Sequence, residues 1–308
     1  MPESFAVVTP QGASIVELFW LAMVPSVLIL AIVFGGIVWV LLRDRGGLDV
    51  PDPEPRHYGR ALEITWTAVP LVLVIVFFLL GLRTMAVVNA EPEPALRVQV
   101  IGHQWWWEFR YPDLGIVAAN ELHVPTGVPV RLELQAADVV HSFWVPKFGW
   151  KKDAIPTRTN TMTVLVNEAG TFEGACTEYC GTQHAWMRIT VVAQPQSEMD
   201  AWAKSQQTPA PPPTESLAQR GRDLFLASTC VSCHAVAGTS AVGRVGPDLS
   251  HIGSRGTIGG GVAERNAQTL EDWVRNPQSV KPGVLMPGYS GLAQGDLAAL
   301  AAYLDSLK

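Results

Sequence analysis

The stretch CTEYCGTQHAWM, residues 176–187, contains two of the chain's four cysteines, followed by a histidine and a methionine. A second histidine, His141, lies in DVVHSFWVP, residues 138–146. Together these side chains offer two thiolates, two imidazoles and a thioether, a soft set that favours copper over a hard cation. A disulfide between Cys176 and Cys180 and a Cys2His2 zinc site are the alternatives, although zinc makes no use of a thioether.

The residues around this stretch alternate in the manner of β-strands. Short runs such as LRVQVIG, VPVRLELQ, TMTVLVN and MRITVV extend from about residue 96 to about residue 192, and Gly, Pro and Asn separate them. This texture is typical of an all-β sandwich or barrel. We therefore expect the two cysteines to lie in a loop after a strand, where a rigid scaffold holds them in place.

Residues 176–187 match the pattern C-x-E-x-C-x-x-x-H-x-x-M at every fixed position, and they resemble the binuclear copper (CuA) loop of cytochrome c oxidase subunit II. The resemblance implies a cupredoxin-like domain in which Cys176 and Cys180 bridge two copper ions. It also implies the remaining contacts, namely terminal imidazoles from His141 and His184, a weak axial thioether from Met187, and a backbone carbonyl from Glu178, whose side chain points towards a magnesium site shared with subunit I.

Two neighbouring stretches extend the resemblance. DVVHSFWVPKFGWKKDAIPTR, residues 138–158, is similar to a family segment but has Thr157 where the family usually has glycine. GHQWWWEF, residues 102–109, is similar to the family's aromatic stretch, and the position of electron entry falls on Trp105. We interpret Trp106 and Trp107 as packing residues, the usual role of tryptophan in a strand.

Two apolar runs precede the β domain. Residues 18–42 and 64–82 contain no charged side chain, and each run is long enough to cross a hydrocarbon core of about 30 Å. A cleaved signal peptide is the competing interpretation of the first run, but the run is too long and a second span follows. The tail before the first run has no Lys or Arg, whereas the loop between the runs holds Arg43, Arg45, Arg56 and Arg60. Both termini are therefore expected outside the cytoplasm.

ALEITWTAVP, residues 61–70, resembles the start of the second transmembrane helix of the same family. There a glutamate lies near the entrance of a proton pathway of subunit I, and Glu63 takes its place. The alternative is an interfacial carboxylate without a role in proton transfer.

CVSCH, residues 230–234, is the attachment signature of c-type haem. In this signature the thiols of Cys230 and Cys233 add to the vinyl groups of haem, and the adjacent His234 becomes an axial iron ligand. A thioredoxin-like redox pair is the alternative, but no βαβ pattern surrounds the motif.

The residues that flank CVSCH resemble a small cytochrome c. SLAQRGRDLFLASTC (216–230) is similar to its leading helix, with Gly221 and Phe225 where the family packs its first helix on its last, and GPDL (246–249) is similar to the loop after the haem. LMPGYSGL (285–292) is similar to the segment that supplies the second axial ligand, which points to Met286. His251 is the rival ligand. Methionine opposite histidine raises the redox potential relative to two histidines.

We therefore expect a multi-domain chain: a tail and a two-helix transmembrane hairpin over residues 1–94 (spans about 17–42 and 64–85), an all-β cupredoxin-like sandwich over 95–195, a proline-rich linker over 196–214, and an all-α class I cytochrome c domain over 215–308. Together the resemblances imply the fused subunit II of a bacterial caa-type oxidase, anchored in the cell membrane with both redox domains on the periplasmic or extracellular side.

The expected path of electrons runs from the chain's own haem c to the copper pair and on to haem in subunit I, where oxygen is reduced to water with proton pumping. Expected partners are subunit I, other oxidase subunits and an external donor, either cytochrome c or a quinol–cytochrome c reductase complex. The net charge of −6 gives no support to a nucleic-acid partner. Alternatives are the CuA subunit of a nitric oxide reductase and a membrane-anchored electron carrier, whereas seven histidines are too few for a second catalytic copper cluster.

Overall fold

The computed structural model describes residues 5–43 and 59–308, and the chain divides into two compact units. One unit consists of residues 10–90, and the other joins the N-terminal residues up to Thr9 to residues 91–308.

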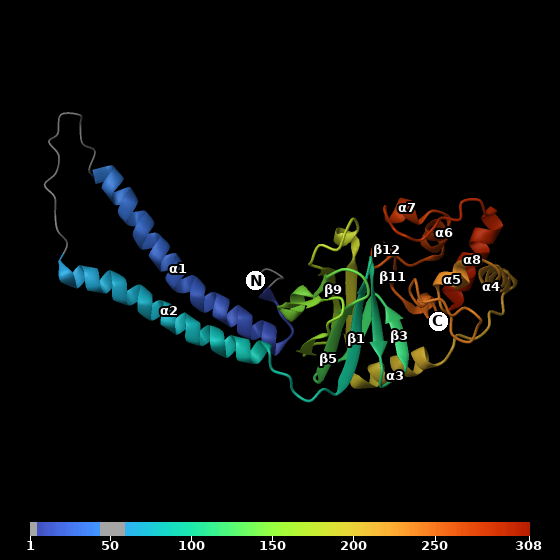
Figure 1. Ribbon diagram of the computed structural model, residues 1–308, viewed down its shortest axis with the longest axis horizontal. Coiled ribbons are helices and arrows are strands. Elements are labelled where there is room, and N and C mark those ends of the chain that lie inside the picture. The colour runs from blue at the N-terminus through green and yellow to red at the C-terminus, as the bar shows by residue number, and fades with distance from the viewer. Residues whose placement is uncertain (1–4, 44–58) are drawn as a thin grey trace. The chain divides into compact units, whose positions relative to one another are not determined.

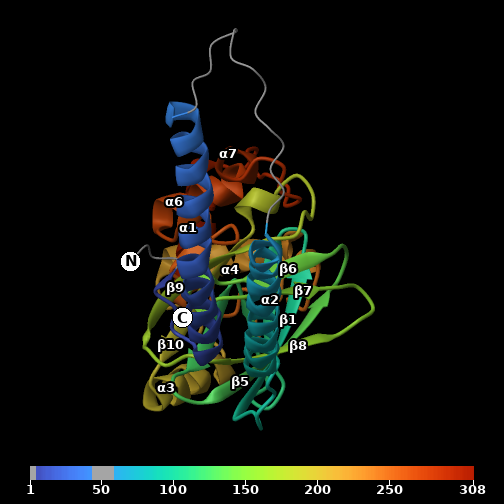
Figure 2. The same ribbon diagram turned by 90° about the vertical axis from the view of Figure 1, so that its left-hand side faces the viewer.

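The smaller unit is a hairpin of two apolar helices, α1 (Pro10–Arg43) and α2 (Arg60–Val88). The helices lie alongside each other, as Figures 1 and 2 show. Both are long and apolar enough to cross a membrane, and their most apolar windows are not buried within the protein. Of the loop arginines, Arg45 and Arg56 lie outside the described residues.

The larger unit begins with a sandwich of two five-stranded sheets, coloured mainly green in Figure 1. The first sheet, in the order β3-β2-β1-β5-β8, consists of β1 (Leu96–His103), β2 (Trp106–Tyr111), β3 (Ile116–Ala119), β5 (Pro129–Ala136) and β8 (Asn160–Leu165). The second, in the order β4-β10-β9-β6-β7, consists of β4 (Glu121–Pro125), β6 (His141–Trp144), β7 (Lys151–Ala154), β9 (Gly170–Cys176) and β10 (Arg188–Gln194). Short 3-10 turns, η2 (Pro146–Phe148) and η3 (His184–Trp186), precede β7 and β10. The expected cupredoxin-like sandwich is confirmed.

Alternating side chains of the strands form the sandwich core. On β5 the side chains of Val130, Leu132 and Leu134 are buried, because every second side chain of a strand points to the same face. On β2, Trp107 and Phe109 are fully buried. Burial of each such side chain contributes about 1.5–3 kcal/mol. The core therefore supplies a rigid base for the loops at the end of the sandwich.

The turn after β7 contains Thr157, which has a φ of 62°. A non-glycine residue costs roughly 1–2 kcal/mol in this left-handed conformation. The turn is nevertheless closed, because Ile155 and Arg158 pair as an isolated bridge. Replacement of the family's glycine therefore keeps the turn, and no ligand of the expected copper site lies in it.

Helix α3 (Gln196–Gln207) lies within the segment that we expected to be a linker. Met199 and Ala203 are buried in the sandwich core, and Trp202 packs against it. The expectation of a linker over 196–214 was therefore wrong for residues 196–207, because apolar residues at helical spacing bury one face of the helix. Only the proline-rich residues after α3 lack regular structure before the next helix.

The C-terminal domain is built from helices and loops. Its elements are α4 (Ser216–Ala227), α5 (Cys230–Cys233), η4 (Ile252–Ser254), α6 (Ala267–Arg275), α7 (Pro277–Val280) and α8 (Gln294–Ser306). A ribbon of two short strands, β11 (Thr257–Ile258) and β12 (Ala263–Glu264), is an addition to the expected all-α domain. Helices α4 and α8 touch at Gly221, where a Cβ atom would lie 1.9 Å from the carbonyl oxygen of Ala299. The first helix of the domain therefore packs on the last, as the resemblance implied.

Candidate copper centre and haem cavity

Strand pairing brings the residues of the expected copper site together. Cys176 is the last residue of β9, and His141 is the first residue of β6. These strands are antiparallel neighbours, with Phe143 opposite Cys176. Cys180 and His184 follow in the loop between β9 and β10, so that loop closes over the end of β6.

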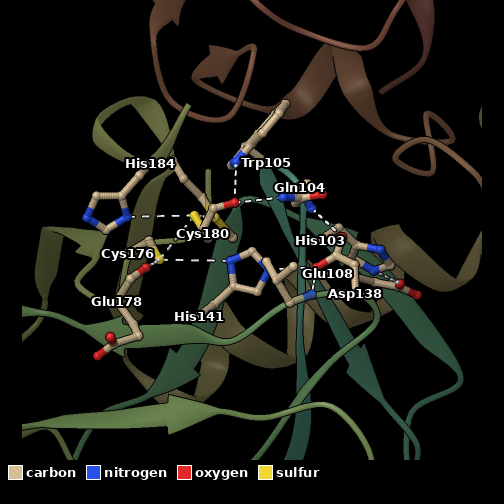
Figure 3. A network of polar contacts seen from close by, with 12 residues as sticks. His103, Gln104, Trp105, Glu108, Asp138, His141, Cys176, Glu178, Cys180 and His184 are labelled. Carbon is tan, nitrogen blue, oxygen red and sulfur yellow. Dashed lines mark hydrogen bonds and ion pairs between the residues drawn. The ribbon is translucent and has the colours of Figure 1, made fainter. Parts of the chain in front are cut away.

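The two sulfur atoms lie between two imidazole rings, as Figure 3 shows. The Sγ atoms of Cys176 and Cys180 are 3.7 Å apart. Nδ1 of His141 lies 3.9 Å from Cys176 Sγ, and Nδ1 of His184 lies 3.6 Å from Cys180 Sγ. One ligand atom each from His141, Cys176 and Cys180 falls within 4.8 Å of the others. The group is thus compact enough to surround metal ions. None of the four cysteines of the chain forms a disulfide, so both thiols of this group are available as ligands.

The paired thiols have opposed tendencies to ionise. Contact with Cys180 lowers the pKa of the Cys176 thiol, burial opposes this, and contact with His141 lowers the pKa further. In turn, contact with Cys176 and burial raise the pKa of Cys180. Two buried thiolates at this separation repel each other strongly unless a cation lies between them. The donor set therefore suits a pair of soft metal ions that share the two thiolates.

Asp138 orients the buried ring of His141. Its carboxylate lies 2.8 Å from His141 Nε2 and also accepts hydrogen bonds from the backbone N–H groups of Val139 and Gln104. Burial alone would lower the pKa of His141, but the contacts with Cys176 and Asp138 outweigh it and raise the pKa. With Nε2–H held by Asp138, Nδ1 is the nitrogen that faces the sulfurs.

Met187 and Glu178 also lie at the cysteine pair. Met187 Sδ is 3.9 Å from Cys180 Sγ, and its side chain is fully buried. The backbone carbonyl oxygen of Glu178 lies 3.2 Å from Cys176 Sγ. The side chain of Glu178 points outwards and lies 3.7 Å from Lys151 Nζ. The loop and the first residue of β6 therefore bring together every residue that the resemblance assigned to the copper site.

Trp105 is attached to the same loop. Its indole N–H donates to the carbonyl oxygen of Cys180 at 3.0 Å, and Gln104 Nε2 donates to that oxygen at 2.7 Å. Trp106 stacks on His103, and Trp107 packs edge-on against His141 and Phe143. Among the three tryptophans, Trp105 is thus the one hydrogen-bonded to the cysteine loop.

Residues of the C-terminal domain form most of the lining of an apolar cavity of about 430 Å³. Cys230, Cys233, His234 and Met286 all line it, together with aromatic and aliphatic side chains. His234 Nδ1 lies 2.7 Å from the carbonyl oxygen of Pro247, which leaves Nε2 free to bind a metal. The residues of CVSCH and the methionine loop thus border one apolar space, which is what a flat porphyrin needs.

His251, the rival ligand, does not line this cavity in the described part of the chain. It is buried, and its Nε2 lies 3.1 Å from the carbonyl oxygen of Gln206 in α3. His251 therefore packs between the C-terminal domain and α3, while Met286 lines the cavity.

The cavity has a wall from the β domain. Gln104, Trp105, Trp106 and Asn120 line it alongside the residues of the C-terminal domain. Trp105 therefore contacts both candidate redox sites. The sequence could not predict this, because Trp105, Cys180 and Cys230 are far apart along the chain. The sequence also did not single out Gln104, Asp138 or Lys281, because their importance depends on contacts between distant segments.

Glu63, in contrast, belongs to the first turn of α2, in the smaller unit. Its proposed role depends on a partner subunit, so it is not part of the two sites of the larger unit.

Comparison with known proteins identifies relatives over nearly the whole chain. Residues 114–194 match the family model "Cytochrome C oxidase subunit II, periplasmic domain", and residues 218–308 match "Cytochrome c". Cytochrome c oxidase subunit 2 of Alkalihalophilus pseudofirmus is 38% identical, covering 97% of this chain and 89% of the relative. The same subunit of Bacillus sp. (strain PS3) is 36% identical, covering 86% and 80%, and that of Bacillus subtilis is 36% identical, covering 83% and 77%.

These matches agree with both sites. A subunit II periplasmic domain implies a CuA copper centre, which the cysteine loop of the β domain fits, and a cytochrome c domain implies haem. Relatives of this kind are components of an oxidoreductase complex, and two apolar helices agree with a membrane-anchored subunit. With 38% identity over nearly its full length, the chain belongs to the family of cytochrome c oxidase subunit 2, with a cytochrome c domain at its C-terminal end.

Proposed function

We propose that this chain accepts electrons at a haem c held by its own C-terminal domain, passes them to the copper pair of the β domain, and delivers them by way of His184 to haem in subunit I, where oxygen is reduced to water with proton pumping. The observation that carries the proposal is the position of Trp105, which lines the haem cavity and donates its indole N–H to the Cys180 carbonyl. One side chain thus contacts both redox sites.

At the copper site, the proposed ligands are the thiolates of Cys176 and Cys180 as bridges, Nδ1 of His141 and His184, the thioether of Met187, and the carbonyl oxygen of Glu178. The copper pair, when bound, shares one electron between two metals. The protein contributes rigidity, because Asp138 fixes the ring of His141 and Gln104 holds the Cys180 carbonyl. Ligands that move little on reduction favour fast transfer at a small driving force.

At the haem site, Cys230 and Cys233 would hold haem c covalently, each S–H adding across one of its vinyl groups. His234 binds the iron through Nε2, since its Nδ1 faces the carbonyl oxygen of Pro247. Met286, which lines the same cavity, would be the second protein ligand of the iron. A thioether opposite an imidazole raises the potential of the iron, which suits a donor to copper.

The remaining assignments concern neighbours of the chain. We propose that the outward-pointing side chain of Glu178 reaches a magnesium site shared with subunit I, and that Glu63 lies near the entrance of a proton pathway in subunit I. We also propose that both redox domains and both termini lie on the outer side of the bacterial cell membrane. The external donor is cytochrome c or a quinol–cytochrome c reductase complex.

The test uses the purified oxidase complex with this full-length subunit. Cys176→Ser should abolish the mixed-valence copper spectrum while the haem c spectrum remains, because the two sites share no ligand. Electrons introduced at haem c should then fail to reach subunit I. Ala185→Ser, at an exposed position of the same loop, is the control and should change neither spectrum. Survival of the copper signal in Cys176→Ser would refute the assigned ligands.

A second measurement identifies the acceptor. The complex should consume oxygen and not nitric oxide, and this chain should copurify with a large haem-bearing subunit in mild detergent. Nitric oxide consumption would favour a nitric oxide reductase, and recovery of the chain alone would favour a free electron carrier.

A further inference from the structure

The cytochrome domain is docked on the β domain through specific hydrogen bonds. Glu121 on β4 accepts hydrogen bonds from the backbone N–H groups of Gly256 and Thr257, at 2.7 and 3.3 Å. The backbone N–H of Arg188 on β10 donates to the carbonyl oxygen of Gly260 at 3.1 Å. A proline-rich connection alone would tether the domain, whereas these bonds also fix its orientation.

Three successive glycines make the close approach of the two backbones feasible. Gly259, Gly260 and Gly261 all have positive φ, between 66° and 84°. A Cβ on Gly260 would lie 3.2 Å from the carbonyl oxygen of Trp105, and one on Gly261 would lie 2.7 Å from Cβ of Arg188. The turn therefore presents bare backbone to the β domain, beside Trp105.

Lys281 lies at the centre of this contact. Only 2% of it is exposed, and its ammonium group donates to the carbonyl oxygen of Trp105 and to that of Gly259, each at 2.9 Å. One acceptor belongs to the β domain and the other to the glycine turn. No carboxylate contributes to the environment of this ammonium group among the described residues. Burial of a cation costs free energy unless hydrogen bonds compensate it. The two carbonyl groups supply this compensation, one from each side of the contact.

The loop between β9 and β10, which carries Cys180 and His184, also binds the backbone of Lys281. Nε2 of Gln183 donates to the carbonyl oxygen of Lys281 at 3.4 Å and to that of Pro282. Gln183 is buried and immediately precedes His184. One residue of the cytochrome domain is thus bound through its side chain to Trp105 and through its carbonyl to the copper loop, and it also lines the haem cavity.

We propose that Lys281 is a positioning residue that fixes the haem-binding domain against Trp105, so that electrons cross between the two sites in one docked arrangement. This inference rests on the proposed function. Lys281 makes no hydrogen bond to an assigned copper or iron ligand, and only its charge acts on one of them, Cys180. Its removal should therefore alter chiefly the relative placement of the two sites.

The experiment uses the complete oxidase loaded with copper and haem. Lys281→Met keeps the length of the side chain but leaves the carbonyl groups of Trp105 and Gly259 without their donor. Electron transfer from haem c to copper after rapid reduction of the haem should be measurably slower than in the unmodified complex, because the transfer rate depends on the separation and orientation of the two sites. Both absorption spectra should stay unchanged. Lys204→Met, at an exposed lysine on α3, is the matched control and should leave the rate unchanged.

Hydrogen exchange provides a second readout that does not depend on electron transfer. The amides of Arg188, Gly256 and Thr257 are protected by bonds between the domains, so they should exchange at least about tenfold faster in Lys281→Met. Glu121→Ala removes another contact of the same interface, and should slow electron transfer and expose the Arg188 amide, which Glu121 does not bind. This variant also serves if Lys281→Met fails to fold.

The outcomes separate the inference from the proposed function. If the unmodified complex transfers no electrons from haem c to copper, the proposed function fails, and exchange at the three amides still tests the docking. If the unmodified complex transfers electrons but Lys281→Met matches Lys204→Met in rate, the inference is overturned. It is also overturned if the rate falls while the three amides keep their protection.

Discussion

Residues that are not ligands shape both redox sites. Asp138 accepts a hydrogen bond from Nε2–H of His141, so that Nδ1 faces the sulfurs. The carbonyl oxygen of Pro247 accepts a hydrogen bond from Nδ1–H of His234, so that Nε2 faces the haem site. Such partners select the nitrogen that binds a metal. The proposed ligands could be named from the sequence because two short motifs and two further segments resemble known families. Their partners could not, since Pro247 offers only a backbone carbonyl.

Met286 is expected to be the second iron ligand. Met286→Ala should lower the midpoint potential of haem c and remove the sulfur-to-iron absorption band, because an imidazole or water opposite His234 stabilises the oxidised iron. His251→Gln should leave both unchanged, since His251 faces Gln206 and does not line the cavity. Redox titration of the purified complex checks this. Retention of the band in Met286→Ala would exclude Met286 as the ligand, whereas a potential that changes only in His251→Gln would return the role to His251.

The half-buried His123 makes the stability of the β domain depend on pH. Its ring stacks on Trp202 with centroids 4.3 Å apart, and burial lowers its pKa to about 4. The unfolded chain binds this proton near pH 6.5 and the folded chain only near pH 4. The free energy of unfolding should therefore fall as the pH falls through that window, by up to roughly 3 kcal/mol. Denaturation at pH 7 and pH 5 measures the loss. In His123→Phe the loss should be smaller, and an unchanged difference would contradict this assignment.

Single contacts between elements decide whether the cytochrome domain forms. The crossing of α4 and α8 leaves no room at Gly221, where a Cβ would lie 1.9 Å from the Ala299 carbonyl oxygen. Gly221→Ala should destabilise this domain by about 2 kcal/mol or more, because the helices must move apart. Thermal unfolding followed at the haem absorption measures this effect. Gly295→Ala, in open space in the first turn of α8, is the control and should change stability by less than about 1 kcal/mol. Equal melting temperatures for the two variants would rule out the proposed contact.

At the same scale, sequence patterns predicted most elements and missed α3. The alternation of β-strands and the apolar helical runs survive in the structure because each element buries the face that its pattern defines. The helix over Gln196–Gln207 was hidden by its polar composition, although Met199 and Trp202 sit at helical spacing. Tertiary burial of two or three side chains is enough to fold such a segment.

For the whole molecule, the arginines between the two helices predict the orientation in the membrane. Alkaline phosphatase fused after Lys308 should be active, because this enzyme folds only outside the cytoplasm, whereas a fusion inserted at residue 50 should be inactive. Enzyme activity in intact cells, compared at equal expression, checks the prediction. The reverse pattern would place both redox domains on the cytoplasmic side, where neither an external donor nor haem attachment fits.

The amino-acid sequence alone determined the identity of the parts: two apolar helices, a β domain with a copper loop, and a haem-attachment motif with one methionine to complete it. The helices follow from runs of apolar residues, and the two sites from short segments that resemble those of known families. The tertiary structure decided how the parts of the larger unit meet, with Trp105 in the wall of the haem cavity and Lys281 between two carbonyl groups. Contacts between residues separated by more than a hundred positions depend on packing, and no local pattern encodes them.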